Sequence, residues 1–177
     1  MRRASDVAAF SEFAEACGPS LFRTAYLMVG DHQLAQDLVQ EALVKTLIAW
    51  PRLHDRANLA AYTRRIVVTT SVSWRRRRSF HERPSDHLPE PRVAGDPGEE
   101  VVTHDAVMHA LLAVPPRQRA AIVLRYYEDL TEAQAAEVLG CSVGTVKSQV
   151  AAGLKHMRAD LGPSFDETLA AGREVTS

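Results

Sequence analysis

The chain has 177 residues, of which 46% are hydrophobic and 24% charged, and its formal net charge at pH 7 is −1. This composition excludes a disordered chain and supplies enough apolar material for one ordinary domain or two small ones. No apolar run approaches the roughly 20 residues of a membrane-spanning helix, and the start, MRRASDVAAFSEF, carries acids where a signal peptide needs an apolar stretch. We therefore expect a cytoplasmic protein with a buried core.

The first clearly marked helix begins at His32, because Asp31 before it is a good N-cap. One face of this helix repeats at helical spacing through Leu34, Leu38, Ala42, Lys45 and Ala49. Another face carries Asp37, Gln40, Glu41 and Val44, and its polar stripe is a candidate docking surface. The alternative is a solvated face on which Glu41 supports Lys45 at i,i+4, an effect of only about 0.2–0.5 kcal/mol. On the residues alone, the solvated face is the favoured interpretation.

The next stretch is ambiguous between strand and helix. The β-branched run from Ile66 to Thr70 favours a strand, whereas Leu59, Tyr62, Ile66 and Thr69 follow a helical period. No partner strand is evident elsewhere in the chain, so a helix is the consistent prediction. Trp74 then lies one turn past Thr70, near the basic end of this helix.

Four arginines, Arg75, Arg76, Arg77 and Arg78, follow Trp74 directly, and the stretch from Tyr62 to Arg78 holds six arginines and no acid. Guanidinium groups neutralise phosphates, and a flat ring can stack on an unpaired base for about 1–3 kcal/mol. The alternative is a solubilising helix end whose cations interact with the helix dipole. Four consecutive arginines exceed what capping requires, so the pattern favours a nucleic-acid contact.

The segment from Ser79 to Glu100 has the opposite charge, with six acids against two arginines. It also collects prolines and glycines, which interrupt helices and strands alike. The sequence therefore predicts an acidic linker over 79–100. It separates an N-terminal unit, 1–78, from a C-terminal unit, 101–161, and a short tail, 162–177, follows. Both units are patterned as helices, so the expected fold class is all-α.

The C-terminal unit carries the more specific pattern. A helix is expected over 101–114, a second over RQRAAIVLRYYEDL after Pro115-Pro116, and a third after Thr131, which forms a capping box with Gln134. Ala136, Gly140 and Val146 then have the spacing of a helix-turn-helix, with a small residue at the helix crossing, a glycine in the turn and an apolar anchor. The alternative is an ordinary helical hairpin with a glycine turn, which does not explain three spaced constraints and two caps.

Ser142 can cap the last helix, which would bury one stripe and expose another. The buried stripe is predicted to hold Val143, Val146, Val150, Leu154 and Met157. The exposed face is predicted to hold Thr145, Ser148 and Ala152, flanked by Lys147, Gln149 and Lys155. Side chains in such positions meet base edges and phosphates in a major groove.

No other chemistry is indicated. Cys17 and Cys141 lie far apart without metal-ligand spacing, so both are expected to be small buried or half-buried residues. The histidines show no metal spacing, no nucleophile partner and no phosphate-binding glycine loop, so we expect no metal, no cofactor and no enzyme. Besides a protein that contacts unpaired nucleic acid, the residues allow a homodimeric helix-turn-helix regulator of duplex DNA and, more remotely, a helical adaptor that binds no DNA.

Two long stretches of the chain resemble a known family. LLAVPPRQRAAIVLRYYEDLTEAQAAEVLGCSVGTVKSQVAAGLKHMRADL is similar to region four of bacterial sigma factors of the extracytoplasmic-function group. GDHQLAQDLVQEALVKTLIAW followed by AYTRRIVVTTSVSWRRRR resembles their region two. The resemblance covers most of the chain in the family's order. It implies a protein that binds core RNA polymerase, directs it to promoters and helps to open the DNA.

The resemblance also implies roles for particular residues. Asp37, Gln40 and Glu41 would dock on the clamp helices of the largest polymerase subunit, which reverses the preference for a solvated face. Capture and melting of the −10 element would fall to Tyr62, Arg64, Arg65, Thr69, Ser73, Trp74, Arg75, Arg76, Arg77 and Arg78. Reading of the −35 element would fall to Ser142, Thr145, Lys147, Ser148, Gln149 and Lys155. The flap region of the second-largest subunit and an anti-sigma factor are further partners that the resemblance implies.

Two departures from the family pattern concern specificity. Thr69 and Ser73 stand where many relatives have Asn and Asp, which leaves the base preference at −10 open. Ala151 and Ala152 stand where relatives often have large or basic side chains. Readout at −35 is therefore expected to depend on the neighbouring polar residues or on DNA shape.

Overall fold

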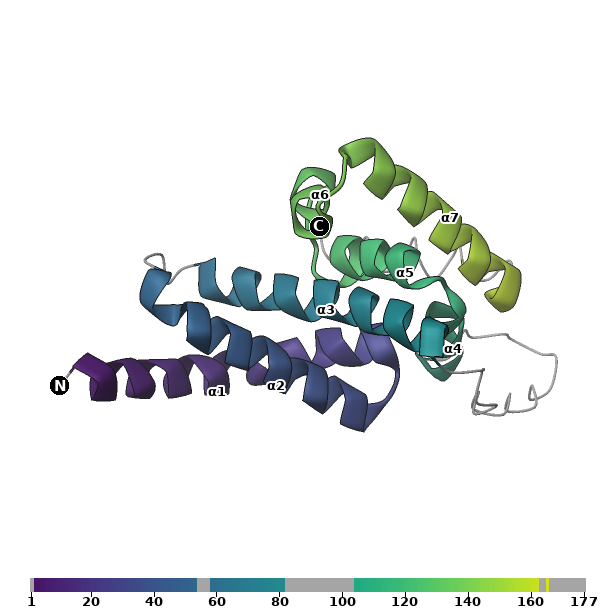
Figure 1. Cartoon of the computed structure of the whole chain (residues 1–177). Helices are drawn as coiled ribbons and strands as arrows, with labels where there is room; N and C mark the ends of the chain where they lie inside the picture. Colours follow the sequence, from purple (N-terminus) through teal and green to yellow (C-terminus); the bar gives the residue numbers. More distant parts are fainter. Residues whose placement is uncertain (1, 54–57, 82–103, 163–164, 166–177) are drawn as a thin grey trace.

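The computed structural model describes residues 2–53, 58–81, 104–162 and 165, with side chains except at 2–5 and 75–81 (Figure 1). Within this part of the chain the secondary structure is helical, with no strand, which confirms the all-α prediction. The predicted linker lies outside the described residues from position 82 onward. Of the predicted tail, only Gly162 and Phe165 are described.

Three long helices build the N-terminal unit: α1 (Arg2–Val29), α2 (His32–Ala49) and α3 (Leu59–His81), with a short 3-10 turn, η1 (Trp50–Arg52), after α2. The predicted start of α2 is confirmed, since Asp31 accepts a hydrogen bond from the Leu34 backbone N–H at 2.8 Å. Gly30 allows the tight turn from α1 into α2 because its φ is +74°.

The N-terminal core lies where the three helices meet. Leu38 and Ala42, two members of the helical repeat on α2, are fully buried, whereas Lys45 of the same repeat is exposed. The core also contains Leu21, Ala25, Ala35, Val39 and Val67. Inside it, the hydroxyls of Thr46 on α2 and Thr63 on α3 lie 3.0 Å apart, so one of them can donate a hydrogen bond to the other.

The ambiguous stretch in the middle of α3 is helical. Its hydroxyl groups bond back to carbonyls of the preceding turn: Thr69 Oγ1 donates to the Arg65 carbonyl at 2.8 Å and Ser73 Oγ to the Thr69 carbonyl at 3.0 Å. These local bonds satisfy the hydroxyls without a partner strand. The helical prediction is therefore confirmed against the β-propensity of the run.

The C-terminal unit consists of α4 (His104–Ala113), α5 (Pro116–Ile122), η3 (Val123–Tyr127), α6 (Glu132–Leu139) and α7 (Val143–Leu161). The helix expected over RQRAAIVLRYYEDL is partly wrong, because its second half is a π-helical turn, η3, which ends at Tyr127. There the Glu128 N–H bonds to the Val123 carbonyl at 3.0 Å, five residues back. Phe165, in the predicted tail, is buried in the core that this unit shares with α1 and α3.

The helix-turn-helix has the predicted local chemistry. Thr131 and Gln134 form a capping box at the start of α6. Gly140 ends α6 with a φ of +63°, and Cys141 N–H returns to the Ala136 carbonyl at 3.0 Å, as in a Schellman motif. Ser142 then caps α7 by accepting from the Thr145 N–H at 3.1 Å. Both cysteines are half-buried and free, as expected.

The predicted buried stripe of α7 needs two corrections. Val146, Leu154 and Met157 are buried, but Val150 is only half-buried, and Val143 is 39% exposed because it lies in the first turn, beyond the helices that cover the rest. Gly153 completes the stripe instead. A Cβ at this glycine would lie 2.6 Å from Ile122 Cδ1, so the absence of a side chain lets α7 approach α5 closely.

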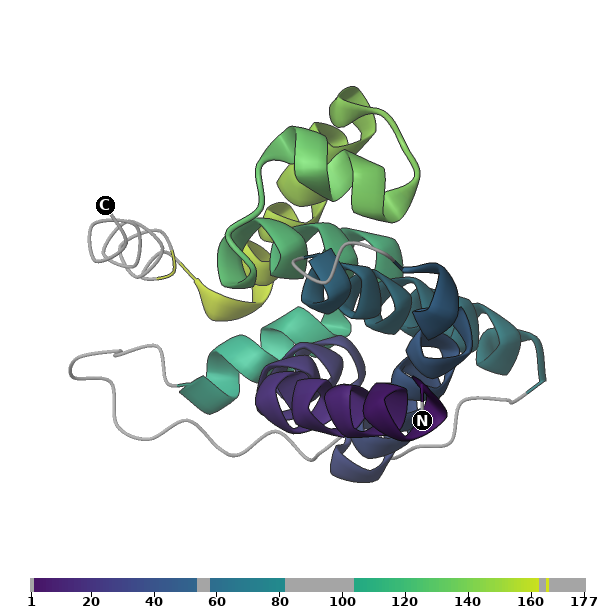
Figure 2. The ribbon, with the colours of Figure 1, turned by 90° about the vertical axis from the view of Figure 1, so that its left-hand side faces the viewer.

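The two units pack against each other. Met28 of α1 and Val68 of α3 share a core cluster with Leu111, Val123 and their neighbours in the C-terminal unit. In Figure 1, α5 lies between α3 and α7, and Figure 2 shows α4 close to α1. The sequence predicted two units but not this interface.

Arg119, on α5, stabilises the interface from within. It is fully buried, and its guanidinium group donates to the carbonyls of Leu111 (2.9 Å), Val114 (2.9 Å) and Leu112 at the end of α4. It also donates to the Met28 carbonyl of α1 at 2.6 Å. One side chain therefore donates hydrogen bonds to the free carbonyl groups at the end of α4 and joins this end to the N-terminal unit.

Candidate nucleic-acid interface

The proposed docking residues lie together on α2. Asp37 and Gln40 are exposed, and Glu41 is half-buried. Their spacing of three and four residues places them on one side of the helix. Gln33 donates to Asp37 at 3.2 Å, which leaves most of the Asp37 carboxylate open to solvent.

An exposed apolar patch continues this side of α2, and of its members only Val44 was placed on this face from the sequence. Val44 is 56% exposed, Leu47 44% and Ile48 73%, each at helical spacing from the acidic residues. The combination of an acidic end and an apolar end on one helix face is typical of a protein-binding surface. The signal was present in the sequence, since Leu47 and Ile48 fall three and four residues after Val44.

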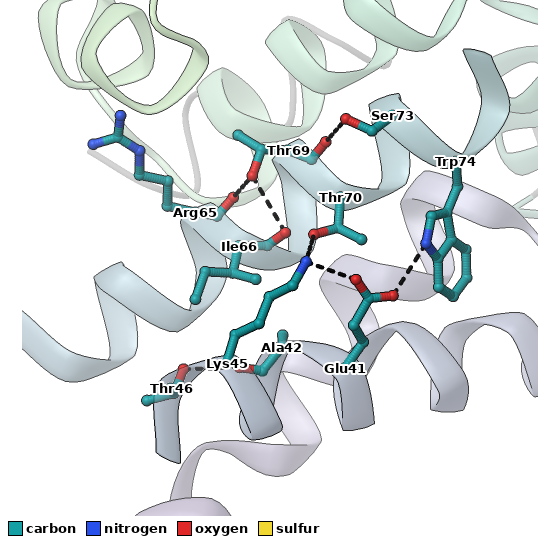
Figure 3. A network of polar contacts seen from close by, with 10 residues as sticks. All are labelled: Glu41, Ala42, Lys45, Thr46, Arg65, Ile66, Thr69, Thr70, Ser73 and Trp74. Carbon is teal, nitrogen blue, oxygen red and sulfur yellow. Dashed lines mark hydrogen bonds and ion pairs between the residues drawn. The ribbon is translucent and has the colours of Figure 1, made fainter. Parts of the chain in front are cut away.

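Glu41 connects this face to α3 (Figure 3). Its Oε1 pairs with Lys45 Nζ at 2.6 Å, and its Oε2 accepts a hydrogen bond from Trp74 Nε1 at 3.1 Å. Lys45 Nζ in turn donates to Thr70 Oγ1 at 3.2 Å. The i,i+4 pair of Glu41 and Lys45 is thus confirmed, but it belongs to a network between two helices.

Four of the expected −10 residues share one face of α3. Tyr62, Arg65, Thr69 and Ser73 recur at spacings of three and four, and Arg65 is exposed while the other three are half-buried. The back-bonded hydroxyls of Thr69 and Ser73 still have free lone pairs, so they can accept hydrogen bonds from a ligand. This face combines a cation, an aromatic ring and hydroxyl groups.

Other expected −10 residues lie elsewhere. Trp74 points toward α2 and packs against the N-terminal core, and Arg64 points toward the C-terminal unit, where its Nε lies 2.7 Å from Glu128 Oε2. The side chains of Arg75, Arg76, Arg77 and Arg78 lie outside the described residues, although their backbone belongs to α3.

The expected −35 residues are arranged along α7. Ser148 and Lys155 lie on the side away from the buried stripe, Thr145 and Gln149 are half-buried at its flanks, and Ser142 stands at the N-terminal end of the helix. Ser148 and Lys155 are exposed, as a groove contact requires. Lys147 lies nearer α6, where its Nζ is 3.4 Å from Glu132 Oε2 in an exposed ion pair worth little in water.

Other kinds of site are not indicated within the described ranges. No three side chains among His, Cys, Asp and Glu come close enough there to hold a metal ion. None of the helices in that part of the chain is both long and apolar enough to cross a membrane. Burial raises the pKa of the Cys17 thiol above its ordinary 9.0, although its backbone hydrogen bond and Arg64 act in the opposite direction.

Comparison with known proteins agrees with this arrangement. Residues 13–81 match the family described as Sigma-70 region 2, and residues 104–157 match Sigma-70, region 4. The RNA polymerase sigma-E factors of Streptomyces avermitilis and Streptomyces coelicolor are each 35% identical over 156 residues, which are 88% of this chain and 87% and 88% of those proteins. A solved structure of the sigma factor RpoE with the anti-sigma factor NepR, from Bartonella quintana, has a TM-score of 0.67 and 26% identity, covering 88% of this chain and 98% of that one.

The chain therefore belongs to the RNA polymerase sigma factors of the sigma-70 family, in the extracytoplasmic-function group.

Proposed function

We propose that this sigma factor binds core RNA polymerase through α2, reads the −10 element with α3 and the −35 element with α7, and helps to melt the DNA. The observation that carries the proposal is the presence of both sigma regions in one chain, each with an exposed polar face on the helix concerned. The work takes place in the cytoplasm, with the polymerase, and requires neither a cofactor nor catalysis.

Docking on the clamp helices of the largest subunit is assigned to Asp37, Gln40 and Glu41. The exposed Val44, Leu47 and Ile48 support this assignment, because a stable protein interface needs apolar area as well as charge. The C-terminal unit would contact the flap region of the second-largest subunit.

Recognition of the −10 element is assigned to Tyr62, Arg64, Arg65, Thr69 and Ser73, with the arginines 75–78 on phosphates beyond them. Each arginine that neutralises a phosphate releases a counterion, so alanine at all four should weaken promoter opening and flatten its salt dependence. Opening by holoenzyme that is unchanged across salt concentrations would contradict the phosphate role.

At the −35 element, α7 would enter the major groove with Ser142, Thr145, Ser148, Gln149 and Lys155 toward the DNA and Lys147 at the side. An anti-sigma factor is a further proposed partner. It is supported by the structural similarity to RpoE, which was solved in complex with the anti-sigma factor NepR.

The test is a pull-down of purified core polymerase with the wild type and with a triple Asp37→Ala, Gln40→Ala, Glu41→Ala variant. A matched control is the double variant Glu12→Ala, Glu15→Ala. It also removes two negative charges, but from exposed positions on α1. We expect stoichiometric binding by the wild type and the control, and loss of binding by the triple variant. A folded wild type that ignores polymerase but binds duplex DNA as a dimer would instead establish the independent regulator.

A further inference from the structure

Glu128 of the C-terminal unit is buried between two side chains of the N-terminal unit. Its side chain is 6% exposed, its Oε2 lies 2.7 Å from Arg64 Nε on α3, and its Oε1 accepts a hydrogen bond from Thr24 Oγ1 on α1. A buried carboxylate is stable only with such partners, and removing one of them leaves an uncompensated charge. The contact between the units therefore depends on an ion pair as well as on apolar packing.

The surroundings of Glu128 extend the same contact. Its neighbour Tyr127 accepts a hydrogen bond from Arg23 Nε at 3.0 Å, and a Cβ on Gly30 would lie 2.4 Å from Leu112 Cδ1. Met28 and Val68 are 2% and 0% exposed in the shared core. The two units thus approach closely, bury apolar side chains and pair a charge where they meet. These are the features of a specific interface.

The π-helical turn of η3 places Glu128 at this position. A π turn accommodates one residue more than an α turn, so the residues after it are rotated relative to a continuous helix. The bond from the Glu128 N–H to the Val123 carbonyl is the one that closes this turn. Glu128 thus faces α1 and α3 because the helix is locally widened immediately before it.

When the two units are packed together, the proposed polymerase-binding surface and the proposed DNA-binding surface differ in accessibility. Asp37 and Gln40 on α2 are exposed, whereas Arg64, assigned from the sequence to the −10 element, has its charge engaged by Glu128. In this state the polymerase surface is available, but one cation of the DNA-binding helix is not.

We propose that Glu128 acts as an intramolecular latch, which holds the free sigma factor closed and keeps Arg64 from nucleic acid until the two units separate. The part of this inference that concerns DNA rests on the proposed function of α3. Closure itself does not, and it can be measured without polymerase or promoter.

The first measurement is the distance between spin labels at Glu12→Cys and Asp160→Cys, two exposed positions on α1 and α7, with Cys17 and Cys141 replaced by alanine. We expect a single narrow distribution for the parent protein. Glu128→Gln should add a second, open population to the distance distribution. The ratio of closed to open molecules should fall about tenfold, because Arg64 then lacks its counter-charge. Thr24→Val, which removes the other partner, should act in the same direction.

The second measurement is the affinity of the free protein for a short fluorescent single-stranded oligonucleotide of mixed sequence. Glu128→Gln should bind about tenfold more tightly, in proportion to the open fraction. Asp129→Asn is the matched control, because it removes one negative charge from the adjacent exposed residue without touching Arg64. The double variant Arg64→Gln, Glu128→Gln should open but gain no affinity.

The outcomes separate the two ideas. A parent protein that is already open, or that stays closed in both Glu128→Gln and Thr24→Val, overturns the latch whatever the protein does with polymerase. Opening without a gain in affinity, or an equal gain in Asp129→Asn, overturns the covering of Arg64 alone. The polymerase pull-down tests the proposed function independently of both.

Discussion

The indole Nε1 of Trp74 donates a hydrogen bond to Glu41 Oε2 at 3.1 Å, which joins the proposed melting helix to the proposed docking face. A tryptophan assigned from the sequence to base stacking is therefore bound to a residue assigned to polymerase binding. Figure 3 shows that Lys45 and Thr70 complete the connection between α2 and α3. The orientation of α3 relative to the docking face depends on these contacts.

Replacing Trp74 with Phe separates the structural role from stacking. Phenylalanine keeps an aromatic face but loses the N–H, so we expect a loss of about 1–2 kcal/mol in unfolding free energy, measured by urea titration. In a double-mutant cycle, the stability losses of Trp74→Phe and Glu41→Gln should add only in part, because both substitutions weaken the same hydrogen bond. Unchanged stability in Trp74→Phe would mean that the hydrogen bond contributes nothing.

Ile48→Ser tests the apolar end of the docking face. Ile48 is 73% exposed, so the free protein should keep its stability within about 0.5 kcal/mol. Its affinity for core polymerase should fall about tenfold or more, because an isoleucine buried at an interface contributes about 1.5–3 kcal/mol. Val7→Ser, at a 61% exposed position on α1, is the matched control and should bind normally.

Arg119→Met tests the buried guanidinium group. It removes the guanidinium hydrogen bonds to the carbonyls of Met28, Leu111, Leu112 and Val114, and we expect a loss of about 3–5 kcal/mol in unfolding free energy. The control is Arg117→Met, an exposed arginine on the same helix, which should change stability by about 0.5 kcal/mol or less. Similar losses in both variants would contradict the assigned role.

The alkylation rate of Cys17 should rise at a higher pH than that of an ordinary thiol. Because burial raises its pKa above 9.0, less thiolate is present at a given pH than in the unfolded chain, and alkylation should be slower. In a Cys141→Ser background, the rate measured by mass spectrometry should rise with a midpoint above 9.0. A midpoint below 9.0 would show that the backbone hydrogen bond and the attraction of Arg64 outweigh burial.

The features that sequence reasoning predicted correctly are local ones. Asp31, Thr131, Gly140 and Ser142 each act within one helical turn, so their roles follow from neighbouring residues alone. The helical period likewise predicted the side of α2 that carries Asp37 and Gln40. Sequence patterns that span about one helical turn were therefore enough to predict helix ends and outward helix faces.

The features that it missed depend on distant contacts. Nothing near Arg64 indicates Glu128 as its partner, and nothing in PPRQR distinguishes the buried Arg119 from the exposed Arg117. Val143 fits the apolar period of α7 but lies beyond the helices that would cover it. Burial at these positions follows from how the two units meet, which periodicity within one helix does not encode.

The π turn of η3 also sets the angular position of everything that follows it. Each residue of an α-helix turns the chain by about 100°, so winding Val123 to Tyr127 as regular α-helix, with no change in the number of residues, would rotate the segment after it by about that amount. The loop into α6 would then leave the core in a different direction, and the helix-turn-helix would be aimed differently from the rest of the molecule. The π winding of this one turn is therefore a geometric control on where α7 points.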